Sequence, residues 1–187
     1  MDTRDRILDV AQQLAQSRGF NAFSYADIAE AVGIRTASIH HHFASKEDLE
    51  RELVVRYRSR FRDRLDAIDR EAESAAERIR RYCLLYRATL EGGALCLCGM
   101  MASDIAALPS PLRIPLQGFF EDQIAWLTET LDDGIRREEW EGPLGRSLHR
   151  AKFVLATLQG GLLIARATND PAFFDRLPAD ILRQLRH

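Results

Sequence analysis

Helical periodicity runs through almost the whole chain and limits its fold more than any other feature. Apolar residues recur at spacings of three and four, as in Leu49, Leu53 and Tyr57, which is typical of helices with one buried face. No segment shows the convincing alternation of apolar and polar residues that marks a half-buried strand. The sequence therefore predicts an all-α protein of about nine helices.

Capping signals divide this helical pattern into elements. Ser24 with Asp27, and Ser45 with Asp48, are capping-box patterns that predict the starts of the second and fourth helices. A glycine at position 33 supplies the backbone freedom for a tight turn between the second and third. Later helices are expected at about residues 75–90, 100–107, 116–131, 148–167 and 172–185.

Residues 24–43 are the most informative segment for function, because they read as two short helices joined at Gly33. The second of these turns Ile39 and Phe43 inward and leaves small and polar residues outside. A short helix with such an outer face fits the major groove of DNA. The residues expected on that face are Thr36, Ala37, His40 and His41.

Charge restricts how such a segment can bind. The formal net charge is -2, and basic and acidic residues nearly balance over the first 46 positions. DNA binding would therefore depend on a few placed cations rather than on a broad basic field. No apolar run approaches the ~20 residues of a membrane span, and the first residues lack the order of a signal peptide. We expect a cytoplasmic protein without membrane partners.

Several separately spaced groups of residues fall in the order of the TetR/AcrR-type transcriptional regulators. They are Gly19-Phe20, Phe23-Ser24, Ile28-Ala29, Ala31-Val32-Gly33-Ile34, Ser38-Ile39, His42-Phe43 and Lys46-Glu47-x-Leu49. This resemblance covers about the first fifty residues. It implies an all-helical homodimer whose first three helices bind a double-stranded, palindromic DNA operator and whose C-terminal domain takes a small-molecule inducer.

The resemblance assigns residues 1–46 to a helix-turn-helix DNA-binding domain and residues 47–187 to a ligand-binding and dimerisation domain. Two positions depart from the family pattern. His40 stands where the family usually has Tyr, and Arg35 stands where it often has a Ser cap. Arg35 can still reach a phosphate or a guanine edge. The expected DNA-binding residues are Ser24, Tyr25, Arg35, Thr36, Ala37, Ser38, His40, His41 and Lys46.

Aromatic and sulfur-containing side chains recur on the fourth to seventh helices. At helical spacing they are either plain core or the lining of a ligand pocket with a few polar groups. The family resemblance favours the pocket. The residues expected to contact ligand are Tyr57, Phe61, Tyr82, Tyr86, Cys98, Met101, Phe119 and Gln123.

The pair Cys96-x-Cys98 suggests an alternative function, a thiol-based sensor of oxidants or electrophiles. With the sixth helix starting just after Cys98, its dipole could activate that thiol. However, no cation lies between Gly92 and Pro111 in the sequence, and Asp104 opposes activation. The competing interpretation is that both cysteines are small buried apolar side chains.

Glycines inside the apolar eighth helix need a structural reason, because each costs about 1 kcal/mol there. One reason is the crossing of a partner helix in a twofold dimer, and the other is tight packing within one subunit. The residues expected at a dimer interface are Gln159, Gly160, Gly161, Ile164 and Phe174.

Neither a metal site, a cofactor nor an enzyme is indicated. The three histidines at 40–42 are consecutive, so on a helix they point about 100° apart and cannot converge on one ion. There is no Ser-His-Asp order or glycine-rich phosphate loop with supporting context. The leading function is a ligand-responsive repressor released from its operator by a small molecule.

Overall fold

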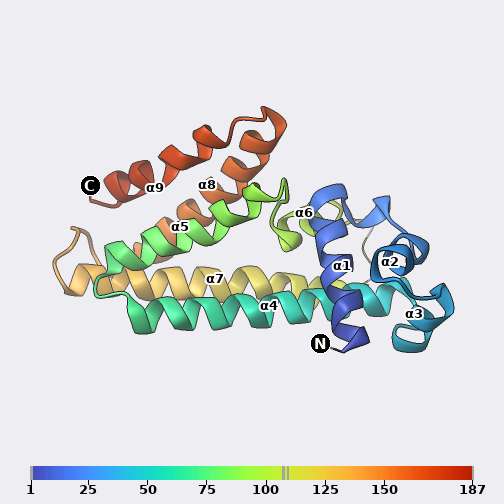
Figure 1. Cartoon of the computed structure of the whole chain (residues 1–187). Helices are drawn as coiled ribbons and strands as arrows, with labels where there is room; N and C mark the ends of the chain where they lie inside the picture. The colour runs from blue at the N-terminus through green and yellow to red at the C-terminus, as the bar shows by residue number, and fades with distance from the viewer. Residues whose placement is uncertain (1, 107, 109, 187) are drawn as a thin grey trace. The chain divides into compact units, whose positions relative to one another are not determined.

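The computed structural model describes residues 2–106, 108 and 110–186. Within that part of the chain the regular elements are all helices, which confirms the predicted all-α class (Figure 1). They are α1 (Thr3–Arg18), the 3-10 turn η1 (Phe20–Ala22), α2 (Tyr25–Val32), α3 (Thr36–His42), α4 (Lys46–Glu71), α5 (Ala75–Glu91), α6 (Leu97–Ser103), α7 (Ser110–Arg136), α8 (Ser147–Ala167) and α9 (Pro171–Leu185).

The start of α6 was predicted wrongly. The helix begins at Leu97 instead of residue 100, with Cys96 as its N-cap. The Cys96 carbonyl accepts a hydrogen bond from the Met100 amide at 2.9 Å, so the first helical turn lies where the sequence offers no capping side chain. The predicted end was also wrong, because the helix ends at Ser103 with Asp104 as its C-cap; residue 107, where the end was expected, lies outside the described residues.

Two compact units divide the chain. The first contains residues up to 60 together with 94–119, and the second contains 61–93 together with residues from 120 onward. Both α4 and α7 contribute residues to each unit. The boundaries of these units differ from the division between residues 46 and 47 that the family resemblance implies. That division separates a DNA-binding domain from a ligand-binding and dimerisation domain, and it remains a prediction.

Local signals in the first unit place α2 and α3. Both members of the expected capping box are formed at Ser24 and Asp27. Gly33 ends α2 in the left-handed conformation, with φ 76° and ψ 40°, and its amide donates to the Ala29 carbonyl at 2.9 Å. The second capping box joins Ser45 and Asp48. We call α1–α3 and the link to α4 the head.

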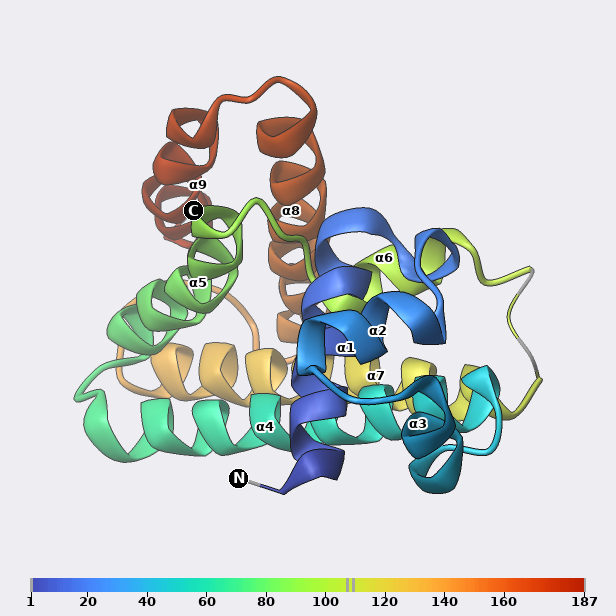
Figure 2. The same cartoon turned by 45° about the vertical axis from the view of Figure 1, so that its right-hand side comes forward.

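The segment that leads into α6 packs against α1 in the same unit (Figure 2). The Leu95 amide donates to the Gln16 carbonyl at 3.0 Å, and the Gln16 side-chain amide donates to the Leu95 carbonyl at 2.8 Å. Gln16 is buried although polar. These reciprocal hydrogen bonds satisfy backbone groups of a link that has no helix of its own.

In the second unit α5, α8 and α9 pack together. A Cβ added at Gly161 would lie 2.2 Å from a Leu177 methyl and 3.3 Å from the Phe174 ring, so glycine permits the close approach of α9 to α8. Gly134 gives the Trp140 ring similar room against α7. In the described part of the chain, no helix combines the length and apolar character that membrane crossing requires.

Candidate nucleic-acid interface and ligand site

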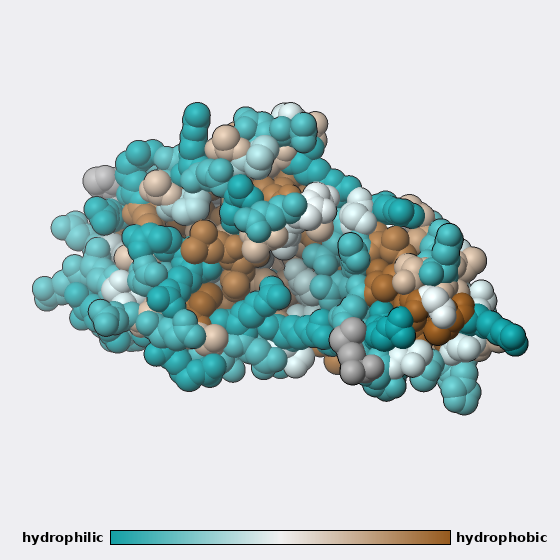
Figure 3. All heavy atoms as spheres, in the orientation of Figure 1, coloured by the Kyte–Doolittle hydropathy of each residue, from teal (hydrophilic) through white to brown (hydrophobic). Residues whose placement is uncertain are grey.

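The outer face of α3 is formed as the sequence pattern predicts. Ile39 and Phe43 are buried in the first unit. The residues Thr36, Ala37, His40 and His41 are exposed, and Ser38 is half-buried. In the space-filling view the visible surface is mostly hydrophilic, with apolar patches over α5 and over α1 and α2 (Figure 3). α3 therefore presents small and polar side chains on its outer face, while Ile39 and Phe43 anchor its inner face in the first unit.

Tyr25 ties α2 to the link between α3 and α4. Its hydroxyl donates to the Ser45 carbonyl at 2.6 Å, with a longer contact to the Phe43 carbonyl at 3.2 Å. Burial raises the pKa of Tyr25 to about 12, and the charges of Asp48 and Glu50 add to this effect. The hydroxyl therefore keeps its proton and acts as a donor inside the head. Its expected contact with DNA remains a prediction.

His40 lies directly beside this tyrosine. The two ring centroids are 4.8 Å apart, with an interplanar angle of 59°. Because the tyrosine is held at its hydroxyl end, its ring is a fixed surface against which the His40 ring packs. His41 is exposed next to it, and its ring centroid lies 5.6 Å from that of half-buried His42.

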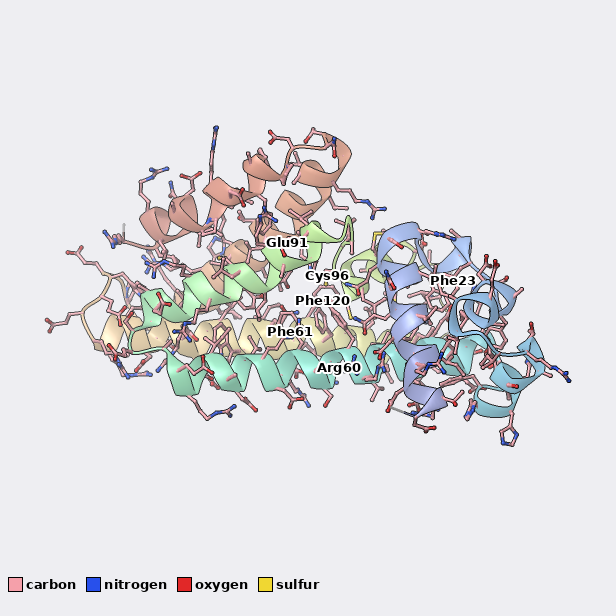
Figure 4. All side chains as sticks on the ribbon, in the orientation of Figure 1. Phe23, Arg60, Phe61, Glu91, Cys96 and Phe120 are labelled. Atoms are coloured by element: carbon pink, nitrogen blue, oxygen red, sulfur yellow. The ribbon has the colours of Figure 1, made fainter. Side chains whose placement is uncertain are left out.

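Lys46 is engaged inside the head. Its ammonium donates to the Phe23 carbonyl at 2.7 Å and to the Phe20 carbonyl at 2.9 Å. The same nitrogen lies 4.9 Å from the centroid of each phenylalanine ring; Phe23 is labelled in Figure 4. The sequence suggested a contact with DNA for Lys46. In the structure this side chain also holds the segment between α1 and α2 to the start of α4.

Most other basic side chains near the head also have internal partners. Arg6 donates to the Val32 carbonyl at 2.6 Å. Ion pairs between α1 and α4 join Arg4 to Glu52 at 2.8 Å, Arg56 to Asp9 at 2.9 Å and Arg60 to Asp9 at 3.0 Å. Arg60 is labelled on α4 in Figure 4.

Arg35 differs from these side chains. It is the exposed N-cap of α3 and makes no side-chain cap hydrogen bond. In the described part of the chain, no ion pair is recorded for it. Ser24, another expected DNA contact, is exposed but donates its hydroxyl to Asp27 at 2.6 Å. This hydrogen bond, together with one from the Ser24 amide, lowers the pKa of Asp27. Of these two residues, Arg35 is therefore the one that offers an exposed charged side chain at the start of α3.

The expected ligand residues fall into two groups, one in each compact unit. In the first unit Tyr57, Cys98, Met101 and Phe119 are buried. The rings of Tyr57 and Phe119 are 5.4 Å apart. The Tyr57 hydroxyl lies 3.8 Å from the Cys96 sulfur, which is labelled in Figure 4.

In the second unit a buried amide joins two tyrosines. The hydroxyls of Tyr82 and Tyr86 donate to the Gln123 side-chain oxygen at 2.7 and 2.6 Å. Phe61 packs edge-on against both tyrosine rings. The Gln159 amide, expected at a dimer interface, points to the Tyr86 hydroxyl at 3.4 Å. Such a network in a low-dielectric core fixes these side chains strongly. That either group contacts a ligand remains a prediction.

Burial opposes reactivity of the cysteine thiols. Cys96 and Cys98 are 1% and 0% exposed. Cys98 is the second residue of α6, so the expectation that the helix starts after it was wrong. Desolvation raises the pKa of Cys98 well above its ordinary value, against a smaller lowering by Arg58. The sequence did not reveal this cation because it comes from α4. Burial likewise raises the pKa of Cys83 to about 12.

The expected dimer residues separate into internal and external ones. Phe174 is 0% exposed and packs near Gly161, so for these two residues the close packing occurs within one subunit. Ile164 is 47% exposed, and the space around Gly160 is open. The sequence did not single out three further exposed apolar residues of α8, Leu148, Phe153 and Leu163. An interface through the outer residues of α8 stays a prediction.

No group of three or more histidine, cysteine or acidic side chains suited to a metal ion is found within the residues that the structure describes.

Comparison with known proteins places this geometry in a family. Residues 7–53 match the model described as "Bacterial regulatory proteins, tetR family". Curated relatives match over different lengths: the transcriptional repressor DhaR of a Mycobacterium species is 24% identical over 164 residues, 86% of this chain and 80% of that one, and the transcriptional repressor KstR2 of Mycobacterium tuberculosis is 37% identical over 68 residues, 34% of each chain. The match thus spans about a third of that relative's length.

Solved structures match along nearly the whole chain. A TetR transcriptional regulator from Legionella pneumophila is 36% identical with a TM-score of 0.89, covering 98% of this chain and 97% of that one. A TetR-family regulator from Agrobacterium tumefaciens is 33% identical with a TM-score of 0.91, covering 99% and 98%. With sequence identity and fold in agreement along its length, the chain belongs to the TetR family of transcriptional regulators.

Proposed function

We propose that this chain is a DNA-binding repressor that acts as a homodimer and is released from a palindromic operator by a small molecule. The observation that carries the proposal is the α2–Gly33–α3 unit, whose outer face is exposed and whose inner face is buried. The named relatives are transcriptional regulators, and KstR2 is a repressor. These names support regulation of transcription rather than catalysis.

Binding to DNA would depend more on the fit of α3 to the major groove than on the number of cations near it. Arg4, Arg6, Arg56 and Arg60 have internal partners, which leaves Arg35 as the exposed cation at the start of α3. Each phosphate neutralised contributes about -0.9 to the slope of log affinity against log salt. An Arg35 contact made twice by a dimer therefore accounts for about 1.8 of that slope.

A second copy would pack against the outer face of α8. Phe153, Gly160, Leu163 and Ile164 lie at spacings of three, four and seven along this helix, which places them on one side. Three of them are large apolar side chains between 45% and 57% exposed, and the fourth is an unobstructed glycine. A twofold dimer through this face would present two α3 helices to successive major grooves, about 34–36 Å apart.

Control by a small molecule is supported by the buried aromatic and polar groups of α4–α7. The Gln123 amide and its two phenols offer hydrogen-bonding groups within apolar surroundings, the mixture that ligand sites use. α4 runs from the head at Lys46 into the second unit. A ligand that favours one arrangement of α4 would shift the DNA-binding equilibrium by its differential affinity.

The first experiment is a gel-shift titration with duplexes from the region upstream of the gene and with duplexes selected from a random pool. We expect sequence-selective binding that weakens steeply with salt. Arg35→Ala should lower the salt slope by about 1.8, whereas Arg176→Ala, at an exposed position of α9, should leave it unchanged. Absence of binding to every duplex, or binding that ignores salt, would rule out the proposal.

Dimerisation is tested by sedimentation. Ile164→Asp should shift the protein toward monomer, while Ile114→Asp, at an exposed site of α7, should not. If the parent protein sediments as a monomer at micromolar concentration, the dimer is not formed through α8 or any other face.

The thiol-sensor alternative makes a different prediction, although thiol burial and raised thiol pKa values weigh against it. Operator binding is measured before and after treatment with an oxidant and an electrophile. A sensor would lose its response in the Cys96→Ser, Cys98→Ser double variant and keep basal binding. A response that survives in the double variant excludes these thiols.

A further inference from the structure

We propose that the head takes up protons on His40 and His41 when it binds DNA, so that operator affinity rises as the pH falls below neutral. This inference rests on the proposed function, since it assumes that α3 meets the phosphates of a duplex. It goes further because it makes hydrogen ions a regulator of binding. The histidine side chain is the one whose ordinary charge change falls between pH 5 and 8.

The position of the histidines favours their charged form next to DNA. His40 and His41 are exposed in the last turn of α3, the helix of which Arg35 is the N-cap. Carbonyl groups at a helix C-terminus carry partial negative charge and stabilise cations there. An imidazolium facing phosphate would gain a charge-assisted hydrogen bond that neutral imidazole cannot match.

Tyr25 gives His40 a second stabilising contact. The tyrosine ring centroid is 4.8 Å from that of His40, and the hydroxyl is fixed on the Ser45 carbonyl at 2.6 Å. A cation within about 6 Å of an aromatic face is attracted by the ring.

Charged groups from three neighbouring helices define the field around this site. α2 supplies Tyr25, and α4 supplies Asp48 and Glu50, which act on that tyrosine. α1 supplies Arg4, whose guanidinium lies 5.2 Å over the Phe43 ring and pairs with Glu52. The remaining groups on or next to α3 are Arg35 and half-buried His42. These acidic and basic groups are the ones that the experiment has to keep constant.

Linkage gives the expected size of the effect. Each proton taken up on binding raises the association constant by up to about tenfold for each unit that the pH falls. A dimer carries two copies of each histidine. We expect affinity for one duplex to increase at least about tenfold between pH 8.0 and pH 6.5 at constant ionic strength.

The test uses the full-length protein and a duplex that it selects from a random pool at pH 7. Affinity is measured between pH 6.5 and 8.5, and calorimetry in two buffers of different ionisation enthalpy counts the protons absorbed. His40→Gln with His41→Gln should abolish most of the uptake, whereas His149→Gln on α8 should not. His40→Lys with His41→Lys keeps the charge at every pH, so its affinity should vary little over this range.

Each result is decisive. Failure to select any duplex contradicts the proposed function itself. Binding that is independent of pH refutes proton uptake while leaving the function intact. A pH dependence that is unchanged in both double variants also refutes the inference, because it assigns the protons to other groups such as Glu50. Circular dichroism checks that the lysine variant is folded. If it is folded, a loss of pH dependence comes from the missing histidines and not from an unfolded head.

Discussion

Replacing Lys46 tests whether its ammonium serves DNA or the fold. The side chain joins the first turn of α4 to the carbonyls of Phe20 and Phe23, at 2.9 and 2.7 Å, and lies over both rings. Lys46→Met keeps the aliphatic stem but removes both donors and the charge. We expect the head to lose stability and the salt dependence of DNA binding to stay the same.

The magnitude follows from these contacts. A hydrogen bond to a charged group contributes about 1.5–3 kcal/mol, and a partly exposed cation over a ring adds about 0.5–1 kcal/mol. Lys46 is half-exposed, so water replaces part of the loss. We therefore expect the free energy of unfolding to fall by about 2 kcal/mol, which lowers Tm by about 4–8 °C in a chain of this size.

Thermal unfolding and salt titrations of DNA binding are measured on the same samples. Lys152→Met, at an exposed position of α8, is the matched control and should change neither quantity in the head. A variant with unchanged Tm and a salt slope reduced by about 1.8 for a dimer would show the opposite, namely that Lys46 contacts phosphate in both subunits. The reasoning from the internal hydrogen bonds would then be refuted.

Three further perturbations probe the fold. Burial raises the pKa of Glu50, so the charged carboxylate destabilises the folded chain at neutral pH. Glu50→Gln should therefore have a higher urea midpoint than the parent protein at pH 7.5. This gain should shrink as the pH falls to about 4.5, the ordinary pKa of a glutamate side chain, because the parent carboxylate then becomes neutral in the folded chain. Gly134→Ala would place a methyl 2.1 Å from the buried Trp140 ring, so we expect a loss of about 1–3 kcal/mol and changed tryptophan fluorescence. Gln123→Leu removes the acceptor of two buried phenols and should lower the free energy of unfolding by about 2 kcal/mol in urea titrations; an unchanged midpoint would contradict their dependence on it.

Local sequence signals were sufficient to predict the helix-turn-helix. The two capping boxes and the left-handed Gly33 are determined by residues within three or four positions of each other. The inward and outward faces of α3 follow from helical period alone, so the exposure of His40 and His41 could be expected from the sequence.

Side-chain partners could not be predicted in the same way. Lys46 contacts residues more than twenty positions earlier, and Arg58 influences Cys98 from another helix. The sequence predicted Phe174 at a dimer interface, whereas in the fold its ring packs near Gly161 within one subunit. These partners depend on how helices pack, and many packings satisfy the same apolar pattern. The early start of α6 has a similar cause, since Cys96 acts as N-cap without a capping side chain.

The match to the family model is confined to the region of the head. The model covers residues 7–53, and the relative KstR2 matches over about a third of its length. A head must fit a groove whose dimensions are the same for every member, which restrains the lengths and faces of α2 and α3. Under the proposed control by a small molecule, the core would have to fit that molecule, so its polar groups could differ between members. The polar groups of the Gln123 cluster in the second unit therefore have to be taken from this chain's own side chains and not from those of its relatives.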